Sequence, residues 1–84
     1  MAEKEIGKIT HYFDKAGVAV IKLSGSLATG DAVKIKKGDS EFTDIVESMQ
    51  IDHDPVTMAQ AGQEVAVKIS QKAKEDSRVF KIEE

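Results

Sequence analysis

The residue types that carry most enzyme chemistry occur in this chain without the spacing that catalysis needs. The 84 residues include two histidines, His11 and His53, and no cysteine. Asp52 and Asp54 flank His53, but a metal site needs three or four converging ligands, and successive residues of a strand or loop point apart. No Gly-x-Ser-x-Gly segment marks a serine nucleophile, and no phosphate-binding Gly-rich loop marks a nucleotide-hydrolysing site. The sequence predicts no catalytic residue, no metal ligand and no cofactor, and we expect a protein that is not an enzyme.

Lysines alternate with apolar residues in the segments that look most like strands. Residues 32–37 have the two-residue period of a half-buried strand, which places Lys34 and Lys36 on its outer face. Residues 65–70 repeat this pattern and place Lys68 outward. Such lysines could contact RNA phosphates, with an affinity that falls steeply as salt rises. Lysines on exposed strand faces also keep sheets soluble and block edge-to-edge pairing, and we favour this interpretation.

Two adjacent aromatic residues, Tyr12 and Phe13, end the first predicted strand. Because successive side chains of a strand point to opposite faces, the two rings cannot both enter one core. We therefore expect one ring to be exposed, and an exposed aromatic ring indicates a partner-binding surface. Lys34, Lys36, Lys68, Tyr12 and Phe13 are accordingly the candidate contact residues for an RNA or protein partner.

The composition is that of a single globular domain spanning residues 1–84. Hydrophobic residues make up 40% and charged residues 32% of the chain, which argues against disorder. The net charge of -3 disfavours a general nucleic-acid binder, since such domains usually carry a basic surplus. No apolar run approaches the ~20 residues of a membrane helix, and the N-terminal residues lack the apolar stretch of a signal peptide. We expect a cytoplasmic protein with no membrane partner, and its oligomeric state is open.

Six apolar segments separated by turn residues predict an all-β fold. They are residues 6–13, 18–23, 32–37, 42–51, 65–70 and 78–82, with fraying expected before residue 6 and a long connection at residues 52–62. The fold class that we predict is a six- or seven-stranded antiparallel β-barrel, because closure removes exposed strand edges. In residues 42–51 the alternation fails, and a bulge near Glu47–Ser48 would let Val46, Met49 and Ile51 all face inward. The predicted core is Ile6, Ile9, Val18, Val20, Leu23, Val33, Ile35, Val46, Met49, Ile51, Val65, Val67, Ile69 and Phe80.

Several short motifs resemble the second, β-barrel domain of translational GTPases such as elongation factor Tu and initiation factor 2. The run Val-Glu-Ser-Met-Gln-Ile at 46–51 is followed by Ala-Gln-Ala-Gly-Gln-Glu-Val at 59–65, and Gly-Asp-x-Val-x-Ile at 30–35 precedes both. The resemblance extends over residues 6–82. Small stand-alone translation elongation factor-like proteins share the Thr-His-Tyr-Phe opening at 10–13 and the segment at 46–53.

This resemblance implies the elongation factor domain 2 type of barrel and a non-catalytic binding module that is translation-related. Its partner would be a protein, the ribosome or tRNA. No GTP binding is expected, because the GTPase domain and its phosphate loop are absent. A similar barrel closes the C-terminus of some collagenase-like peptidases that are linked to RNA modification. The alternative function is therefore an accessory substrate-docking subunit of a separate RNA-modifying or peptidase-like enzyme.

Overall fold

The computed structural model describes residues 2–70 and 72–83 of the chain, and every regular element among them is a β-strand. The strands are β1 (Ala2–Phe13), β2 (Val18–Leu23), β3 (Leu27–Ala28), β4 (Ala32–Lys37), β5 (Ser40–Ile45), β6 (Met49–Ile51), β7 (Asp54–Val56), β8 (Met58–Ala59), β9 (Glu64–Lys68) and β10 (Arg78–Glu83). Within these described ranges, no helix is long and apolar enough to cross a membrane.

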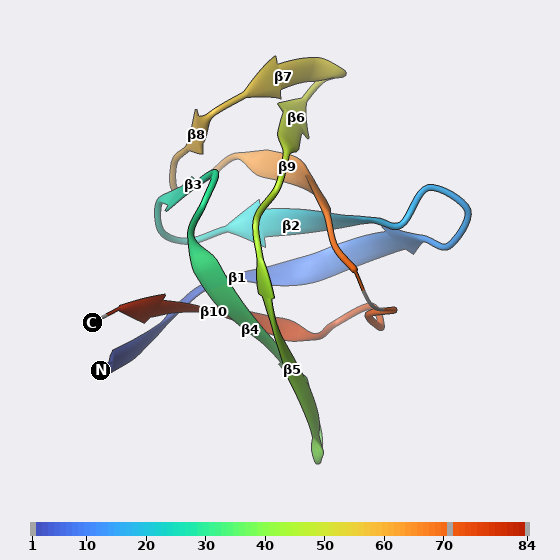
Figure 1. Cartoon of the computed structure of the whole chain (residues 1–84), viewed down its shortest axis with the longest axis vertical. Helices are drawn as coiled ribbons and strands as arrows, with labels where there is room; N and C mark the ends of the chain where they lie inside the picture. The colour runs from blue at the N-terminus through green and yellow to red at the C-terminus, as the bar shows by residue number, and fades with distance from the viewer. Residues whose placement is uncertain (1, 71, 84) are drawn as a thin grey trace.

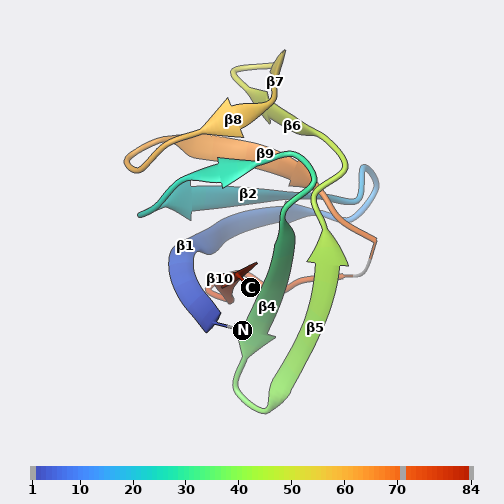
Figure 2. The ribbon, with the colours of Figure 1, turned by 60° about the vertical axis from the view of Figure 1, so that its left-hand side comes forward.

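Eight strands form one antiparallel sheet that curls strongly around the core (Figures 1 and 2). Their order is β5-β4-β10-β1-β2-β9-β6-β7, and β3 pairs with β8 in a separate two-stranded sheet. Among the described residues no ladder joins the edge strands β5 and β7. The predicted all-β antiparallel class is confirmed, but the sheet has more strands than predicted and is not closed by hydrogen bonds into a six- or seven-stranded barrel.

The N-terminal strand is longer than predicted and spans two neighbours. Ala2 to Glu5 do not fray, since Ala2 pairs with Glu83 and Glu5 with Phe80 of β10. The register of β1 shifts between Glu5 and Gly7 against β10, and again between Ile9 and His11 against β2. Such bulges bend a strand, so β1 follows the curl of the sheet while pairing on both sides. The two ends of the chain consequently lie side by side (Figure 1).

The segment that was predicted as one strand at residues 42–51 is two strands, β5 and β6. The non-strand residues between them change the facing, so that Val46 and Met49 are both buried, as predicted, whereas Ile51 is only half-buried against the core. The long connection predicted after residue 51 is instead a tight hairpin between β6 and β7. Asp52 and His53 form its two-residue turn, with φ of 51° and 69°. Positive φ at both central residues is the geometry of a type I′ turn, which matches the twist of the paired strands.

The core contains ten of the predicted residues. The predicted facing was wrong for residues of two strands, β2 and β10. Ala19 and Ile21 of β2 are fully buried, whereas Val18 and Val20 lie half-buried on the outer face. In β10 the buried residue is Val79, not Phe80, because Val79 is paired with Ile35 of β4 on the inner face. Apolar residues occur on both faces of each segment, and in β2 the residue that marks the outer face, Lys22, follows the two valines on that face. The buried apolar residues are Ile6, Ile9, Ala19, Ile21, Leu23, Leu27, Val33, Ile35, Val46, Met49, Ala59, Val65, Val67, Ile69, Ala73 and Val79; Ile51 packs on them half-buried.

Candidate functional site

Lys34 is engaged in ion pairs within the chain. Its Nζ lies 2.6 Å from Glu3 Oε2 and 3.9 Å from Glu41 Oε2. The hydrogen bond to Glu3 raises the pKa of Lys34 above its ordinary value, against a smaller opposing effect of burial. Lys34 is therefore part of a β1–β4–β5 surface network, and a partner would have to compete with Glu3 for its ammonium group.

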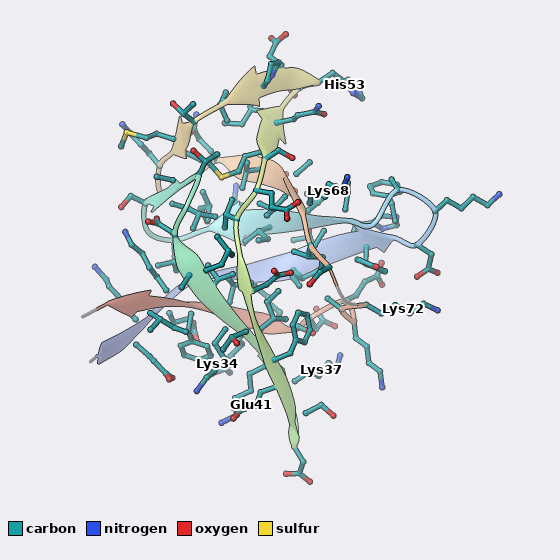
Figure 3. The ribbon with its side chains drawn as sticks, in the orientation of Figure 1. Lys34, Lys37, Glu41, His53, Lys68 and Lys72 are labelled. Atoms are coloured by element: carbon teal, nitrogen blue, oxygen red, sulfur yellow. The ribbon has the colours of Figure 1, made fainter. Side chains whose placement is uncertain are left out.

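The three candidate lysines lie on two separate parts of the sheet. Figure 3 labels Lys34 and Lys68, and Lys36 belongs to the same strand as Lys34. Lys36 is exposed on β4, opposite Arg78 of β10 and Glu41 of β5. Lys68 is exposed on β9, opposite Val18 of β2. Strands β10, β1 and β2 separate β4 from β9 in the sheet. The structure therefore does not bring Lys68 together with Lys34 and Lys36, and their role in partner binding stays a prediction.

The two adjacent aromatic rings separate as expected from strand geometry. Tyr12 is half-buried against the core, whereas 49% of Phe13 is exposed. The ring of His11 lies 4.3 Å from that of Phe13, centroid to centroid, and His11 Nδ1 lies 3.0 Å from Glu75 Oε2. These contacts fix the outer side chains at the end of β1. Binding of a partner by Tyr12 or Phe13 is not established by this geometry.

A separate group of lysines lines an open pocket between the β4–β5 hairpin and the segment before β10. We call it the lysine pocket; its volume is about 310 Å³. Its lining residues are Ile35, Lys37, Ser40, Glu41, Phe42, Lys72, Ala73, Lys74 and Ser77. Ile35 and Ala73 are buried and Phe42 is half-buried, so the pocket has an apolar floor and a rim of three lysines.

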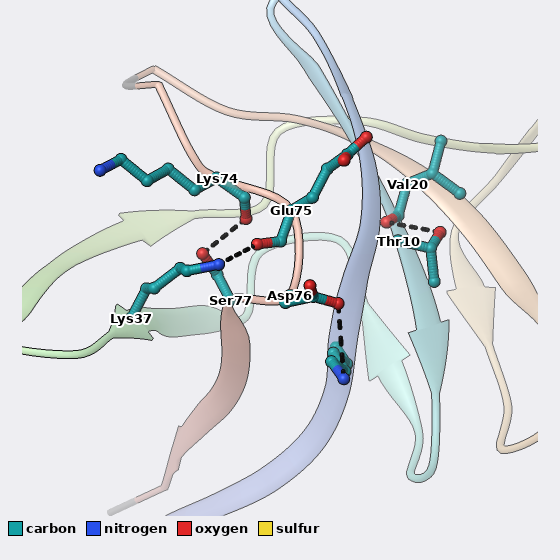
Figure 4. A network of polar contacts seen from close by, with 8 residues as sticks. Thr10, Val20, Lys37, Lys74, Glu75, Asp76 and Ser77 are labelled. Atoms are coloured by element: carbon teal, nitrogen blue, oxygen red, sulfur yellow. Dashed lines mark hydrogen bonds and ion pairs between the residues drawn. The ribbon is translucent and has the colours of Figure 1, made fainter.

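Short hydrogen bonds hold the wall of the lysine pocket in place (Figure 4). Lys37 Nζ donates to the carbonyl oxygen of Glu75 at 2.6 Å, and Ser77 Oγ donates to that of Lys74 at 2.6 Å. The N–H of Asp76, where φ is 70°, donates to the carbonyl oxygen of Ile9 at 2.8 Å. The tight turn at residues 74–77 is thus anchored both to β1 and to the hairpin, and the pocket is built before any ligand arrives.

The carboxylate of Asp44 anchors β5 to the chain that leaves β9. It accepts hydrogen bonds from the N–H of Ser70 at 2.7 Å, the hydroxyl of Ser70 at 2.9 Å and the N–H of Ile45 at 2.8 Å. Burial opposes ionisation of Asp44, but these three donors together hold its pKa below the ordinary value. A charge-assisted tie therefore joins the edge strand β5 to the residues that follow β9.

A second hollow adjoins the lysine pocket and shares Lys37 with it. Its lining residues are Lys36, Lys37, Gly38, Asp76, Arg78 and Phe80. Together the two hollows gather five cationic side chains and two carboxylates, in a chain whose net charge is -3. Arg78 pairs with Glu5 and Asp76 with Lys8, each at 3.5 Å. Lys36, Lys72 and Lys74 take part in none of the salt bridges formed within residues 2–70 and 72–83.

The sequence reasoning missed this pocket because its lysines come from distant segments. Lys37 ends β4, whereas Lys72 and Lys74 lie in a segment without strand structure. The run of charge around Lys72 and Lys74 was the only local signal, and such runs are most often solvated surface. His53 is exposed in its turn, and within the described ranges no three His, Cys, Asp or Glu side chains gather to hold a metal ion.

Comparison with known proteins relates the chain to one part of larger proteins. No protein-family model matches it. The uncharacterized protease MJ0090 of Methanocaldococcus jannaschii is 36% identical over 81 residues, which cover 95% of this chain and 20% of that protein. The chain therefore spans about a fifth of the length of the curated relative that it matches.

Two solved structures share the fold over nearly the whole chain. One is the crystal structure of the C-terminal domain of a Geobacillus thermoleovorans protein described as a U32 peptidase. Its TM-score is 0.88 at 18% identity, over 95% of this chain and 93% of that chain. The selenomethionine variant of that domain gives a TM-score of 0.85 at 18% identity, over 90% and 96% of the two chains.

These findings overturn the resemblance to translation factors. The relative and both structures are proteins described as peptidases, not elongation or initiation factor domains. The misleading motifs, such as Gly-Asp-x-Val-x-Ile and Ala-Gly before a strand, specify turns followed by half-buried strands. Different small antiparallel folds need the same local features, so these motifs indicated the fold class but not the family.

Proposed function

We propose that this chain is a non-catalytic accessory module that docks a substrate or partner for a larger peptidase-like protein. The observation that carries the proposal is the match of nearly the whole chain to about a fifth of an uncharacterized protease. The likeness of its fold to the C-terminal domain of a protein described as a U32 peptidase also supports a module that is separate from the catalytic part. A module of this kind adds affinity and position to a catalytic unit without supplying reacting groups.

The structure supports a binding role in two further ways. The lysine pocket is preformed, because hydrogen bonds hold its wall at Lys37 and Ser77. Preorganisation lowers the entropic cost of binding. We also propose that the curled sheet acts as a barrel in which Ser70 covers the Asp44 end of the β5 edge, while the Glu41 end stays open. This arrangement would leave the pocket as the open mouth of the barrel.

A domain-replacement experiment tests the proposed function. Three proteins are compared on fluorescent peptide substrates: the Methanocaldococcus relative, the same protein without its matching segment, and a chimera carrying this chain in its place. We expect the deletion to raise KM about tenfold with a smaller change in kcat, and the chimera to restore KM, since docking contributes binding rather than chemistry. Peptide hydrolysis by the isolated chain, or an unchanged KM after the deletion, would contradict the proposal.

A capture experiment tests the choice of partner independently. The tagged chain is incubated with lysate of its own cells at about 0.1 M and 0.5 M NaCl, and both protein and RNA are identified. We expect a protein with a peptidase-like catalytic sequence at both salt concentrations. Recovery of RNA alone, lost at the higher salt concentration, would contradict the proposal and favour a polyanion as the partner.

A further inference from the structure

We propose that the lysine pocket binds an extended acidic peptide segment, with its carboxylates on Lys72 and Lys74 and an apolar side chain on Phe42. This inference rests on the proposed function and names the class of ligand that the module docks. It is drawn from three properties of the pocket: its charge, its apolar floor and the free strand edge beside it.

The rim of the pocket is cationic and only partly neutralised. Glu41 is the one carboxylate among its lining residues, against the three lysines. Lys72 and Lys74 form no salt bridge with any described residue, and both are exposed. Lys37 uses one N–H of its ammonium group in the hydrogen bond to the carbonyl oxygen of Glu75. Because an ammonium group has three N–H donors, two of them are left for a ligand. Each of these lysines can therefore donate a hydrogen bond to a carboxylate of the ligand without breaking an existing ion pair.

The floor of the pocket favours a ligand that carries an apolar group as well as negative charge. Ile35, Phe42 and Ala73 present an apolar surface below the rim. An apolar side chain entering a pocket of about 310 Å³ would remove that surface from water, which is favourable by about 25 cal/mol per Å². The pocket is therefore matched to a ligand that combines carboxylates with a neighbouring apolar group.

The edge of the sheet beside the pocket favours an extended backbone. β5 pairs only with β4 among the described strands, so one side of it has no ladder. Lys37 and Ser40 close a two-residue turn, so hydrogen-bonded pairs with β4 alternate from Ser40 along the hairpin. The main-chain N–H and C=O of Glu41 consequently point away from β4, where an added peptide strand would bind.

An acidic peptide fits these features better than a nucleic acid does. Single-stranded nucleic acids are held by base stacking on exposed aromatic rings together with phosphate contacts. The aromatic ring of the lysine pocket, Phe42, is half-buried in the floor. The net charge of -3 would also repel a long polyanion beyond the pocket. A short peptide that alternates acidic and apolar residues avoids both difficulties.

Fluorescence anisotropy with defined probes tests the inference. The probes are a fluorescein-labelled (Glu-Val)4 peptide, the matched (Lys-Val)4 peptide and an eight-nucleotide oligouridylate. We expect saturable binding of the acidic peptide, and a Kd raised at least about tenfold by the double substitution Lys72→Glu, Lys74→Glu, since two attractive contacts become repulsive. Glu41→Gln should lower the Kd, because it removes the carboxylate that opposes the ligand.

The matched control is the double substitution Lys4→Glu, Lys15→Glu, at exposed lysines outside the pocket. It changes the net charge equally, and we expect it to leave the Kd within about twofold. The inference is overturned if the acidic peptide does not bind, if either other probe binds as tightly, or if the control weakens binding as much as the pocket variant. If the acidic peptide does not bind but the chimera restores the KM of the relative, the peptide-binding role of the lysine pocket is rejected and the proposed function is kept. If the acidic peptide binds but deleting the matching segment of the relative leaves KM unchanged, only the proposed function is rejected.

Discussion

At the scale of a single residue, the hydrogen bonds that Asp44 accepts from Ser70 affect the free energy of unfolding of the domain. Its folded-state pKa lies below the ordinary value of 3.8. A depressed carboxyl pKa contributes stability that is present above the unfolded-state pKa and is lost as pH falls through the folded-state value. The tie between Asp44 and Ser70 should therefore hold at neutral pH and release in acid.

We predict that Asp44→Asn lowers the free energy of unfolding by about 1 kcal/mol at neutral pH, because the side chain is only partly buried. The difference from wild type should shrink below about pH 4. Urea denaturation at a series of pH values measures this, with Asp54→Asn at an exposed site as the control. A difference between Asp44→Asn and wild type that is the same at pH 7 and in acid would show that the charge of Asp44 does not matter.

Gly7 is required by a close approach of two strands, not by its conformation. A Cβ added at Gly7 would lie 2.7 Å from Ile21 Cγ2 and 2.7 Å from the carbonyl oxygen of Lys22. We predict that Gly7→Ala costs about 1–3 kcal/mol, because β1 or β2 must move. Thermal unfolding followed by circular dichroism measures the loss. Gly25→Ala is the comparison, since the nearest atom to its Cβ would be Ile6 Cγ2 at 3.2 Å; an equal or larger loss there would refute the argument.

The strands show at the scale of elements what alternation can and cannot predict. The bounds of β2 and β4 were predicted correctly, and so was the inward facing of Val33 and Ile35 in β4, where lysine marks the outer face. In β2 the outer face carries Val18 and Val20, and Lys22 near the end of the strand is the residue that marks this face as outward. The β6–β7 hairpin was missed because Asp52 and His53 take positive φ without glycine, whereas glycine is the usual signal.

The corrected facing of β2 gives a direct test. Ile21→Asp should abolish cooperative unfolding, because a buried unpaired carboxylate costs several kcal/mol, comparable to the stability of a small domain. Val33→Asp and Val67→Asp, at buried positions, should do the same. Val20→Thr on the half-buried outer face should cost less than about 1 kcal/mol. Thermal melting ranks the variants, and a melting temperature for Ile21→Asp equal to wild type would reverse the assignment.

The candidate site depends on the topology of the whole molecule, which local patterns do not encode. The lysine pocket forms because the chain returns after β9 to lie beside the β4–β5 hairpin (Figure 1). No periodicity relates Lys37 to Lys72. The predicted contact lysines were instead chosen from the two most regular strands, and three strands of the sheet separate Lys34 on β4 from Lys68 on β9. Sequence alone thus yielded the class of fold and missed the surface that gathers the charge.

The same topology makes the last strand central to folding. β10 lies between β4 and β1, although it ends the chain, and its residue Val79 is fully buried. Removing residues 78–84 would leave β5-β4 without a ladder to the remaining strands of the sheet. We predict that this truncated protein shows no cooperative thermal transition, and that a synthetic peptide of residues 77–84 restores one.

A circular permutant separates this effect from simple loss of chain length. Ala2 and Glu83 are paired across β1 and β10, so a short glycine linker can join the ends while new ends open at Gly38 and Asp39. We expect the permutant to melt cooperatively, because every ladder is kept and only the β4–β5 turn is cut. Cooperative melting of the truncated protein without the peptide would mean that β10 is dispensable. If β10 is required, an attachment of this domain to a larger protein must preserve the pairing of β1 with β10.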